Sequence, residues 1–346
     1  MKFILNTAEF KNAVEKVLKL PSAENVKLSI KGKICCLCAT NATQFITTQI
    51  TAKSKANADM LLTDTKTLAK AMKYYTGEQI EFEYVGTTLS IVCGGKKANQ
   101  SLIDVKTFPK IPAVGAKANN DFNYSNKKLK ERFNTIKHAI SENNTKPALT
   151  GVYFNGSDMV GVDGHRLAVN KDKALDIKSP FIVPLATVKL VNDVLSDSIQ
   201  VKNDNKYIEF QDGNTTVVSR LIDGDYPKYG EIIGKKGKKV MSVDTKEFIN
   251  SLNYLNTFQS SKSKSAACWS GDTVKNANGT ADSKITVDNP AALDIEIGFN
   301  IDYMLEILSQ FKDDVKIFIK NAVSPIIITY RKGDIVAALS PVRIKN

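Results

Sequence analysis

The sequence predicts an α+β fold of three similar domains, each with two helices backed by an antiparallel sheet. Six segments carry apolar residues at spacings of three and four, as amphipathic helices do. Every second one of these segments is followed by short runs in which apolar and polar residues alternate, as in strands with one buried face. The same order of helices and strands therefore occurs three times along the 346 residues.

The six predicted helices each present one apolar stripe to a core. A polar residue suited to an N-cap precedes five of them, because its side-chain oxygen can accept a hydrogen bond from a free N–H of the first turn. These N-caps are Asn6, Asp64, Ser125, Asp244 and Asn300. The stripes are Phe10–Leu18, Leu68–Tyr75, Leu129–Ile140, Val188–Leu195, Phe248–Leu255 and Ile301–Leu308.

Strand-like runs follow the second, fourth and sixth helices. They are Ile80–Tyr84, Leu89–Ile91, Ser101–Asp104, Ile199–Val201, Tyr207–Phe210, Arg220–Asp223, Val315–Ile319, Ile326–Ile328 and Ile335–Leu339. The first two blocks also share a motif, since Leu102-Ile103-Asp104 precedes Phe108-Pro109-Lys110 and Leu221-Ile222-Asp223 precedes Tyr226-Pro227-Lys228. This likeness indicates an internal repeat. Polar or glycine-bearing stretches near 114–120 and 234–239 suit the boundaries, which gives domains at 1–119, 120–238 and 239–346.

The composition favours an acidic partner. Lys and Arg number 48 against 36 Asp and Glu, a formal charge of +12, which suits nucleic acid or a membrane surface. The alternative is that the lysines simply cover solvent-exposed faces and bind no acidic partner. No stretch of 18 apolar residues occurs and the first residues do not suit a signal peptide, so we expect a cytoplasmic protein without a membrane partner. The five cysteines lack the paired spacings of a zinc site, and we expect buried thiols and no bound metal.

Lysines recur on the polar faces of the predicted helices. Lys66, Lys70 and Lys73, for example, fall at i, i+4 and i+7, opposite an apolar stripe. Lysines in this pattern suit phosphate contacts that carry no base readout. The residues predicted to face DNA are Lys11, Lys16, Lys19, Lys66, Lys70, Lys73, Lys127, Lys130, Lys137, Lys189 and Lys246.

An enzyme would have to use one of the two histidines, His138 or His165. The run Asp163-Gly164-His165-Arg166 could in isolation be a catalytic loop. However, the chain has neither a Ser or Cys nucleophile motif nor a glycine loop for phosphate. We therefore expect no catalytic residues and no cofactor, and a hydrolase that uses His165 remains the enzyme alternative.

Five segments of the chain form a pattern that is typical of one known family: 146–152, 162–168, 221–229, 297–300 and 340–343. Together, and in this order, they resemble the bacterial sliding clamp, which is the beta subunit of DNA polymerase III. The resemblance implies DNA-clamp domains that close a ring as a head-to-tail homodimer, with helices inside and sheets outside. Such a ring would slide on double-stranded DNA, tether the replicative polymerase and be opened by an ATP-driven clamp loader, without catalysis. The alternative is a basic DNA-binding protein that does not encircle DNA.

The resemblance also implies a cleft for partner peptides between the second and third domains. An apolar groove with a few polar anchors is what a short extended peptide needs. The matching positions are Leu149, Val162, Gly164, His165, Arg166, Leu167, Pro227, Ile232, Leu339, Pro341, Val342 and Arg343. The chain departs from the family at Val162, where Thr is frequent, and at Ser340 and Val342, where methionines are usual.

Overall fold

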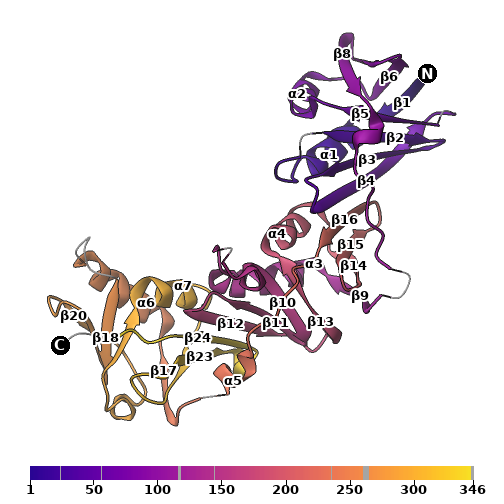
Figure 1. Ribbon diagram of the computed structural model, residues 1–346. Coiled ribbons are helices and arrows are strands. Elements are labelled where there is room, and N and C mark those ends of the chain that lie inside the picture. The colour runs from indigo at the N-terminus through magenta and orange to yellow at the C-terminus, as the bar shows by residue number, and fades with distance from the viewer. Residues whose placement is uncertain are drawn as a thin grey trace. The chain divides into compact units, whose positions relative to one another are not determined.

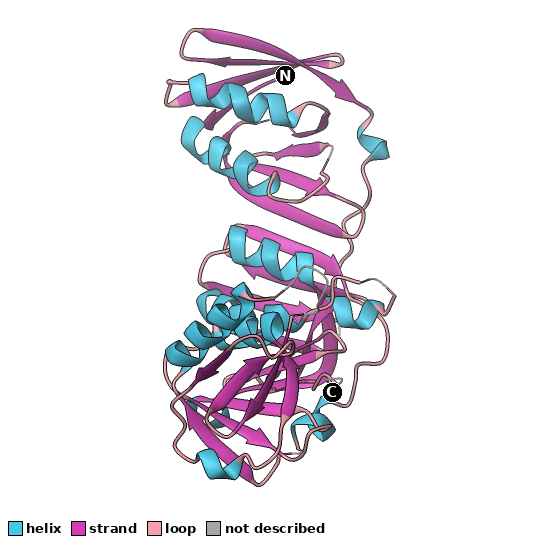
Figure 2. Cartoon of the chain, turned by 90° about the vertical axis from the view of Figure 1, so that its left-hand side faces the viewer, coloured by secondary structure: helices cyan, strands magenta, loops and turns pink. Residues whose placement is uncertain are grey.

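The computed structural model describes residues 1–23, 25–55, 57–115, 118–143, 145–234, 236–259 and 265–343 (Figure 1). The chain divides into two compact units. Unit 1 comprises Met1–Leu129 and Ala186–Leu221, and unit 2 comprises Lys130–Leu185 and Ile222–Asn346. In both units helices lie against the faces of sheets (Figure 2). Both units contain part of the second predicted domain, and the division into three domains stays a prediction.

All six predicted helices are present, and a side-chain cap begins several of them. Asn6 accepts a hydrogen bond from the N–H of Glu9, and Asp244 from that of Glu247, at 3.0 and 2.7 Å. A seventh helix, α5 (Tyr229–Ile233), was not predicted. The others are α1 (Thr7–Val17), α2 (Thr65–Ala71), α3 (Asn126–Ile136), α4 (Leu185–Val194), α6 (Thr245–Thr257) and α7 (Ile301–Leu308). Within the described residues, none of the helices has the length and apolar character needed to cross a membrane.

Unit 1 contains a single sheet of 12 strands in which every recorded pairing is antiparallel. Strands of the first and second repeats meet where β4 pairs with β16, with Gln44 opposite Ser219. In spatial order the strands are β1 (Lys2–Asn6), β6 (Gln79–Val85), β7 (Thr88–Cys93), β8 (Lys96–Ile103), β5 (Asn57–Leu62), β2 (Val26–Lys31), β3 (Ile34–Thr40), β4 (Gln44–Lys53), β16 (Thr215–Arg220), β15 (Tyr207–Asp212), β14 (Ser198–Asn203) and β9 (Asn120–Ser125).

Aromatic side chains fill the core of unit 1 where α1 packs on the sheet. The Phe82 ring stacks on Phe3 at 4.8 Å between centroids and meets Phe10 of α1 edge-on at 5.1 Å. All three side chains are fully buried. Full burial of a Phe side chain contributes about 1.5–3 kcal/mol, so this cluster holds α1 to the sheet.

Unit 2 contains a sheet of 8 strands and a sheet of 4, again with antiparallel pairings. The larger sheet runs β13 (Ile177–Pro184), β10 (Gly151–Gly156), β11 (Asp158–Val162), β12 (Arg166–Lys171), β24 (Ile335–Leu339), β23 (Ile326–Tyr330), β22 (Val315–Ile319) and β17 (Lys239–Val243). The smaller runs β20 (Asp282–Lys284), β19 (Thr273–Asn276), β18 (Ala266–Ser270) and β21 (Ile297–Asn300). Buried Trp269 of β18 packs on Phe248 of α6, at 5.3 Å between ring centroids.

The predicted strand at Arg220–Asp223 is wrong. The strand in that region, β16, begins five residues earlier, at Thr215. The side chain of Asp212 accepts a hydrogen bond from the N–H of Thr215 at 2.9 Å and so closes the turn that starts the strand. Beyond Arg220 the chain leaves β4, and Ile222 forms only an isolated bridge with Ile182.

Candidate partner-binding site and DNA-facing helices

The turn between β11 and β12 holds the central motif of the sequence. The Asp163 side chain accepts hydrogen bonds from the N–H groups of His165 and Arg166, at 2.8 and 2.7 Å, as turn aspartates commonly do. Gly164 has φ +93°, a left-handed conformation that favours glycine. The turn therefore presents exposed His165 at its tip and directs Arg166 into the protein.

Arg166 ties this turn to helix α7. Its Nε and Nη2 atoms each lie 2.9 Å from Oδ2 of Asp163, and its Nη1 pairs with Glu306 of α7. The guanidinium carbon lies 4.1 Å from the centre of the Tyr303 ring, a cation–π contact. Only 9% of the Arg166 side chain and 12% of that of Asp163 are exposed, so this pair is largely shielded from water, whereas Glu306 is 53% exposed.

Four of the predicted cleft residues meet in one apolar cluster of unit 2. Leu149, Val162 and Leu167 are buried in it, and half-buried Ile232 of α5 packs against it. We call this set the unit 2 cluster; its buried members are Leu149, Val160, Val162, Leu167, Val169, Tyr229, Ile327, Val336 and Ala338. These residues supply the apolar surface that a peptide site requires.

The other predicted cleft residues surround this cluster or lie outside it. Leu339 is buried in a different core, because alternate residues of β24 point to opposite faces of the sheet. Pro227, Pro341 and Val342 are half-buried, and Arg343 is exposed. The segment after β24 is anchored, since the N–H of Val342 donates to the carbonyl of Gly298 at 2.8 Å.

Three tyrosines of the cluster region were not among the predicted site residues. Tyr153 stacks on Tyr226 with 4.3 Å between centroids, and the Tyr229 hydroxyl donates to Asp158 Oδ2 at 2.8 Å. Burial raises the pKa of the Tyr226 and Tyr229 hydroxyls, so both stay protonated and act as donors. The repeated Tyr226-Pro227-Lys228 motif could have pointed to Tyr226, whereas no sequence signal singled out Tyr153.

A polar cavity of about 470 Å³ adjoins the turn, and both histidines of the chain line it. The two ring nitrogens of His138 are buried and have no hydrogen-bond partner. Burial, reinforced by the charge of Arg166, lowers the pKa of His138 to about 4, so its ring is neutral at pH 7. Among the described residues, no three His, Cys, Asp or Glu side chains are grouped so as to hold a metal ion.

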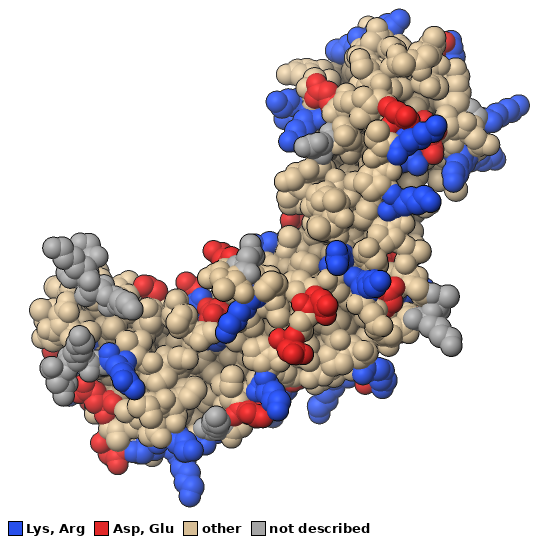
Figure 3. Space-filling view, viewed as in Figure 1, with Lys and Arg blue, Asp and Glu red and all other residues tan. Residues whose placement is uncertain are grey.

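The lysines predicted to face DNA are mostly exposed on helices or at their ends. Nine are exposed, whereas Lys11 and Lys16 are half-buried. None of the eleven forms an ion pair with a carboxylate in the described part of the chain. They are therefore free to contact phosphates, although the face in Figure 3 shows Lys and Arg interspersed with Asp and Glu.

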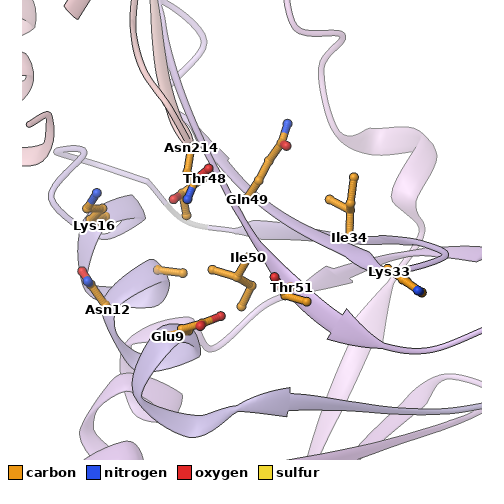
Figure 4. Close-up of a pocket in the computed structure, with 11 residues that line it drawn as sticks. Glu9, Asn12, Lys16, Lys33, Ile34, Thr48, Gln49, Ile50, Thr51 and Asn214 are labelled. Carbon is orange, nitrogen blue, oxygen red and sulfur yellow. The ribbon is translucent and has the colours of Figure 1, made fainter. Parts of the chain in front are cut away.

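Lys16 lines a polar cavity of about 450 Å³ in unit 1 (Figure 4). Its Nζ atom donates to the hydroxyl of Thr215 at 3.2 Å. The side chains of Lys33, Gln49 and Asn214 contribute further donors, and Glu9 is the only carboxylate among the lining residues. A lining rich in donors suits contact with a phosphate better than contact with an apolar peptide.

Comparison with known proteins shows a consistent similarity to bacterial sliding clamps. Residues 123–228 match the model of the DNA polymerase III beta subunit, central domain. The beta sliding clamp of Chlamydia muridarum is 24% identical and that of Staphylococcus aureus 26% identical; the alignments cover 95% of each chain in the first case, and 78% of this chain and 74% of the relative in the second. The chain is thus similar to bacterial sliding clamps along most of its length, and its central part matches the model of that family's central domain.

Solved structures confirm the predicted fold class. The DNA polymerase sliding clamp of Bacillus subtilis superposes with a TM-score of 0.88 over 100% of both chains, at 19% identity. A clamp from Pseudomonas aeruginosa, solved with a ligand, gives 0.88 over 99% of this chain and 100% of that one, at 18% identity. The fold of the sliding clamps is therefore retained although most residues differ.

Proposed function

We propose that this protein is a DNA sliding clamp: a ring-shaped homodimer that encircles double-stranded DNA and tethers the replicative polymerase for processive synthesis. The observation that carries the proposal is the match of residues 123–228 to the beta-subunit central domain, together with 24% identity to a beta sliding clamp over 95% of the chain. In this role the protein acts in the cytoplasm as a topological tether, without catalytic residues, cofactor or metal. Its three clamp domains would be 1–119, 120–238 and 239–346.

The exposed lysines support sequence-independent contact with DNA. They lie on α2, α3, α4 and α6 or just beyond the ends of α1, α2 and α3, and their side chains have no carboxylate partners in the described part of the chain. Contacts of lysine with phosphate position a protein on the duplex without reading its sequence. Loose, exchangeable contacts of this kind suit a ring that slides.

Open strand edges support a head-to-tail dimer. Among the described strands, β8 pairs with β5 only at Leu102 and Ile103, and β20 pairs only with β19. The remaining edge of β8 and the outer edge of β20 therefore have free backbone groups that can pair with another chain. Pairing of β8 in one protomer with β20 in its partner would join the first domain to the third, and a clamp loader would open that contact.

The unit 2 cluster supports a site for peptides from partner proteins such as the polymerase. Apolar Leu149, Val162 and Leu167 would receive an aliphatic or aromatic anchor, and Arg166 and His165 would orient the peptide backbone or a polar side chain. The other proposed contacts are Gly164, Pro227, Ile232, Leu339, Pro341, Val342 and Arg343.

The oligomeric state tests this proposal against the alternative, a basic DNA-binding protein that does not encircle its substrate. Sedimentation equilibrium of the full chain at micromolar concentration should give the mass of a dimer. A strictly monomeric mass would favour the alternative, because a ring of six domains requires two protomers of three domains each.

A further inference from the structure

Unit 1 repeats the turn that holds the central motif of unit 2. The Asn41 side chain accepts hydrogen bonds from the N–H groups of Thr43 and Gln44, at 3.3 and 2.9 Å. These bonds correspond to those that Asp163 accepts from His165 and Arg166. Ala42, at the position of Gly164, also has a left-handed φ of +73°.

The strands around the two turns match as well. The carbonyl of Thr43 accepts a hydrogen bond from the N–H of Arg220 at 3.0 Å, as the carbonyl of His165 does from Ser340 at 2.9 Å. In one case the turn leads into β4 beside β16, and in the other into β12 beside β24. The position of the proposed peptide site in unit 2 therefore has a counterpart within unit 1.

A pocket of about 320 Å³ occupies this counterpart position. Its lining combines apolar and polar residues: Ala42, Leu61, Phe108 and Pro109 are apolar, and Ser22, Asn25, Thr40, Asn41 and Thr107 are polar. Phe108 and Pro109 belong to the repeated motif and correspond to Tyr226 and Pro227. Phe108 is half-buried and Pro109 is exposed, so an entering side chain would meet both an aromatic ring and a proline.

The charges around this pocket differ from those around the unit 2 site. Among the described residues, none of those that line the pocket is charged. Three exposed cations lie next to the lining segments. Lys106 and Lys110 flank the lining residues 107–109 in sequence, and the N–H of Arg220 donates to the carbonyl of Thr43 beside the turn. Gln44 stands at the position of Arg166, so the pocket lacks the guanidinium that pairs with Asp163 and Glu306 in unit 2.

We propose that this pocket is a second docking site, which takes a short, extended, acidic peptide segment of a partner protein. An aliphatic or aromatic anchor of the peptide packs against Leu61, Phe108 and Pro109, and its carboxylates lie near the three cations. The chemistry of the occupant follows from the apolar side chains and polar hydrogen-bonding groups of the lining and from the neighbouring cations. The inference rests on the proposed function, because it takes the unit 2 cluster as a peptide site.

Peptide binding by the full chain tests the inference. The probe is the fluorescein-labelled hexapeptide Asp-Asp-Leu-Phe-Asp-Asp, titrated by fluorescence anisotropy. We expect two binding events per chain. Pro109→Asp should weaken one event about tenfold or more by adding a charge that repels the peptide, and the matched control Pro227→Asp should weaken only the other. The neutral peptide Asn-Asn-Leu-Phe-Asn-Asn should bind the pocket in unit 1 more weakly.

A photocrosslinking version of the probe, with benzophenone on the Phe ring, locates the sites independently of how the variants fold. Crosslinks at 40–42 or 108–109 are expected beside those in the unit 2 cluster. A single event that only Pro227→Asp weakens, with crosslinks confined to unit 2, would overturn the second site and leave the proposed function standing. Binding at the unit 1 pocket alone would support this inference and count against the unit 2 site, and no binding anywhere would overturn both.

Discussion

Neutralising three lysines on helix faces should change how strongly salt weakens DNA binding. Lys70, Lys73 and Lys130 are exposed and lack carboxylate partners in the described part of the chain, so replacing all three by Gln removes phosphate contacts without breaking ion pairs. Each lost phosphate contact lowers the slope of log K against log salt by about 0.9, which gives about 2.7 for the three lysines of one protomer. For each protomer in contact with DNA, the loss of affinity between 50 and 200 mM salt should then be about 40-fold smaller than in the unchanged protein.

Equilibrium binding to a labelled DNA duplex over a salt series measures this slope. The matched control replaces Lys31, Lys171 and Lys316 by Gln, because these lysines are equally exposed but lie on strands. Both triple variants change the net charge by the same amount, and neither should lower the melting temperature measurably. An equal change of slope in the two variants would refute the assignment of DNA contact to the helix faces.

Three further predictions concern unit 2. Leu167→Ala should lower the free energy of unfolding by about 2–5 kcal/mol, since it opens a cavity in the unit 2 cluster; a loss below 1 kcal/mol in urea denaturation would contradict that packing. Asp163→Asn should cost about 1–3 kcal/mol, because that carboxylate is only 12% exposed, whereas Glu306→Gln, at 53% exposed, should cost less than about 1 kcal/mol; the reverse order would be inconsistent with the Arg166 contacts. The lowered pKa of His138, about 4 against 6.5, means that the unfolded chain binds this proton first, so the free energy of unfolding should fall as pH drops from 6.5 towards 4. His138→Leu should flatten that pH dependence, and an unchanged profile would show that other groups cause it.

Helix positions could be predicted from the sequence because each long helix buries one continuous stripe. Phe10 and Val14 of α1 are fully buried on the face that the spacing indicated, and Asn6 caps the helix as expected. Helix α5 escaped prediction, because five residues are too few to show a period of 3.6. It is held by packing of Tyr229 and Ile232 on the unit 2 cluster, which is a tertiary effect.

Strand boundaries were predicted less well where side chains of the preceding turn decide them. Two strands, Val315–Ile319 and Ile335–Leu339, were predicted with their observed ends. The first alternates between buried and more exposed residues, and the second is wholly apolar. The run at Arg220–Asp223 looked equally regular, yet the Asp212 turn starts the strand at Thr215. The hydropathy pattern of the sequence gives no sign of that hydrogen bond, so the start of the strand could not be predicted from it.

The candidate site could be predicted as a set of motifs but not as a geometry. The sequence pointed to Asp163–Arg166, but the contact of Arg166 with Tyr303 and Glu306 joins residues about 140 positions apart. The stacking of Tyr153 on Tyr226 likewise depends on tertiary packing between distant segments. Leu339 was assigned to the cleft by resemblance; it is buried in the other core, and its part in the peptide site stays a prediction.

Retention on circular DNA tests the central claim most directly. The protein would be loaded on nicked circular DNA by a bacterial clamp loader with ATP, washed in high salt and then released by cutting the circle once. A second clamp of known loading behaviour serves as the loading control. Encirclement predicts that the protein survives the wash and is lost on linearisation. Loss during the wash while the control clamp is retained, or equal retention on linear and circular DNA, would contradict the account.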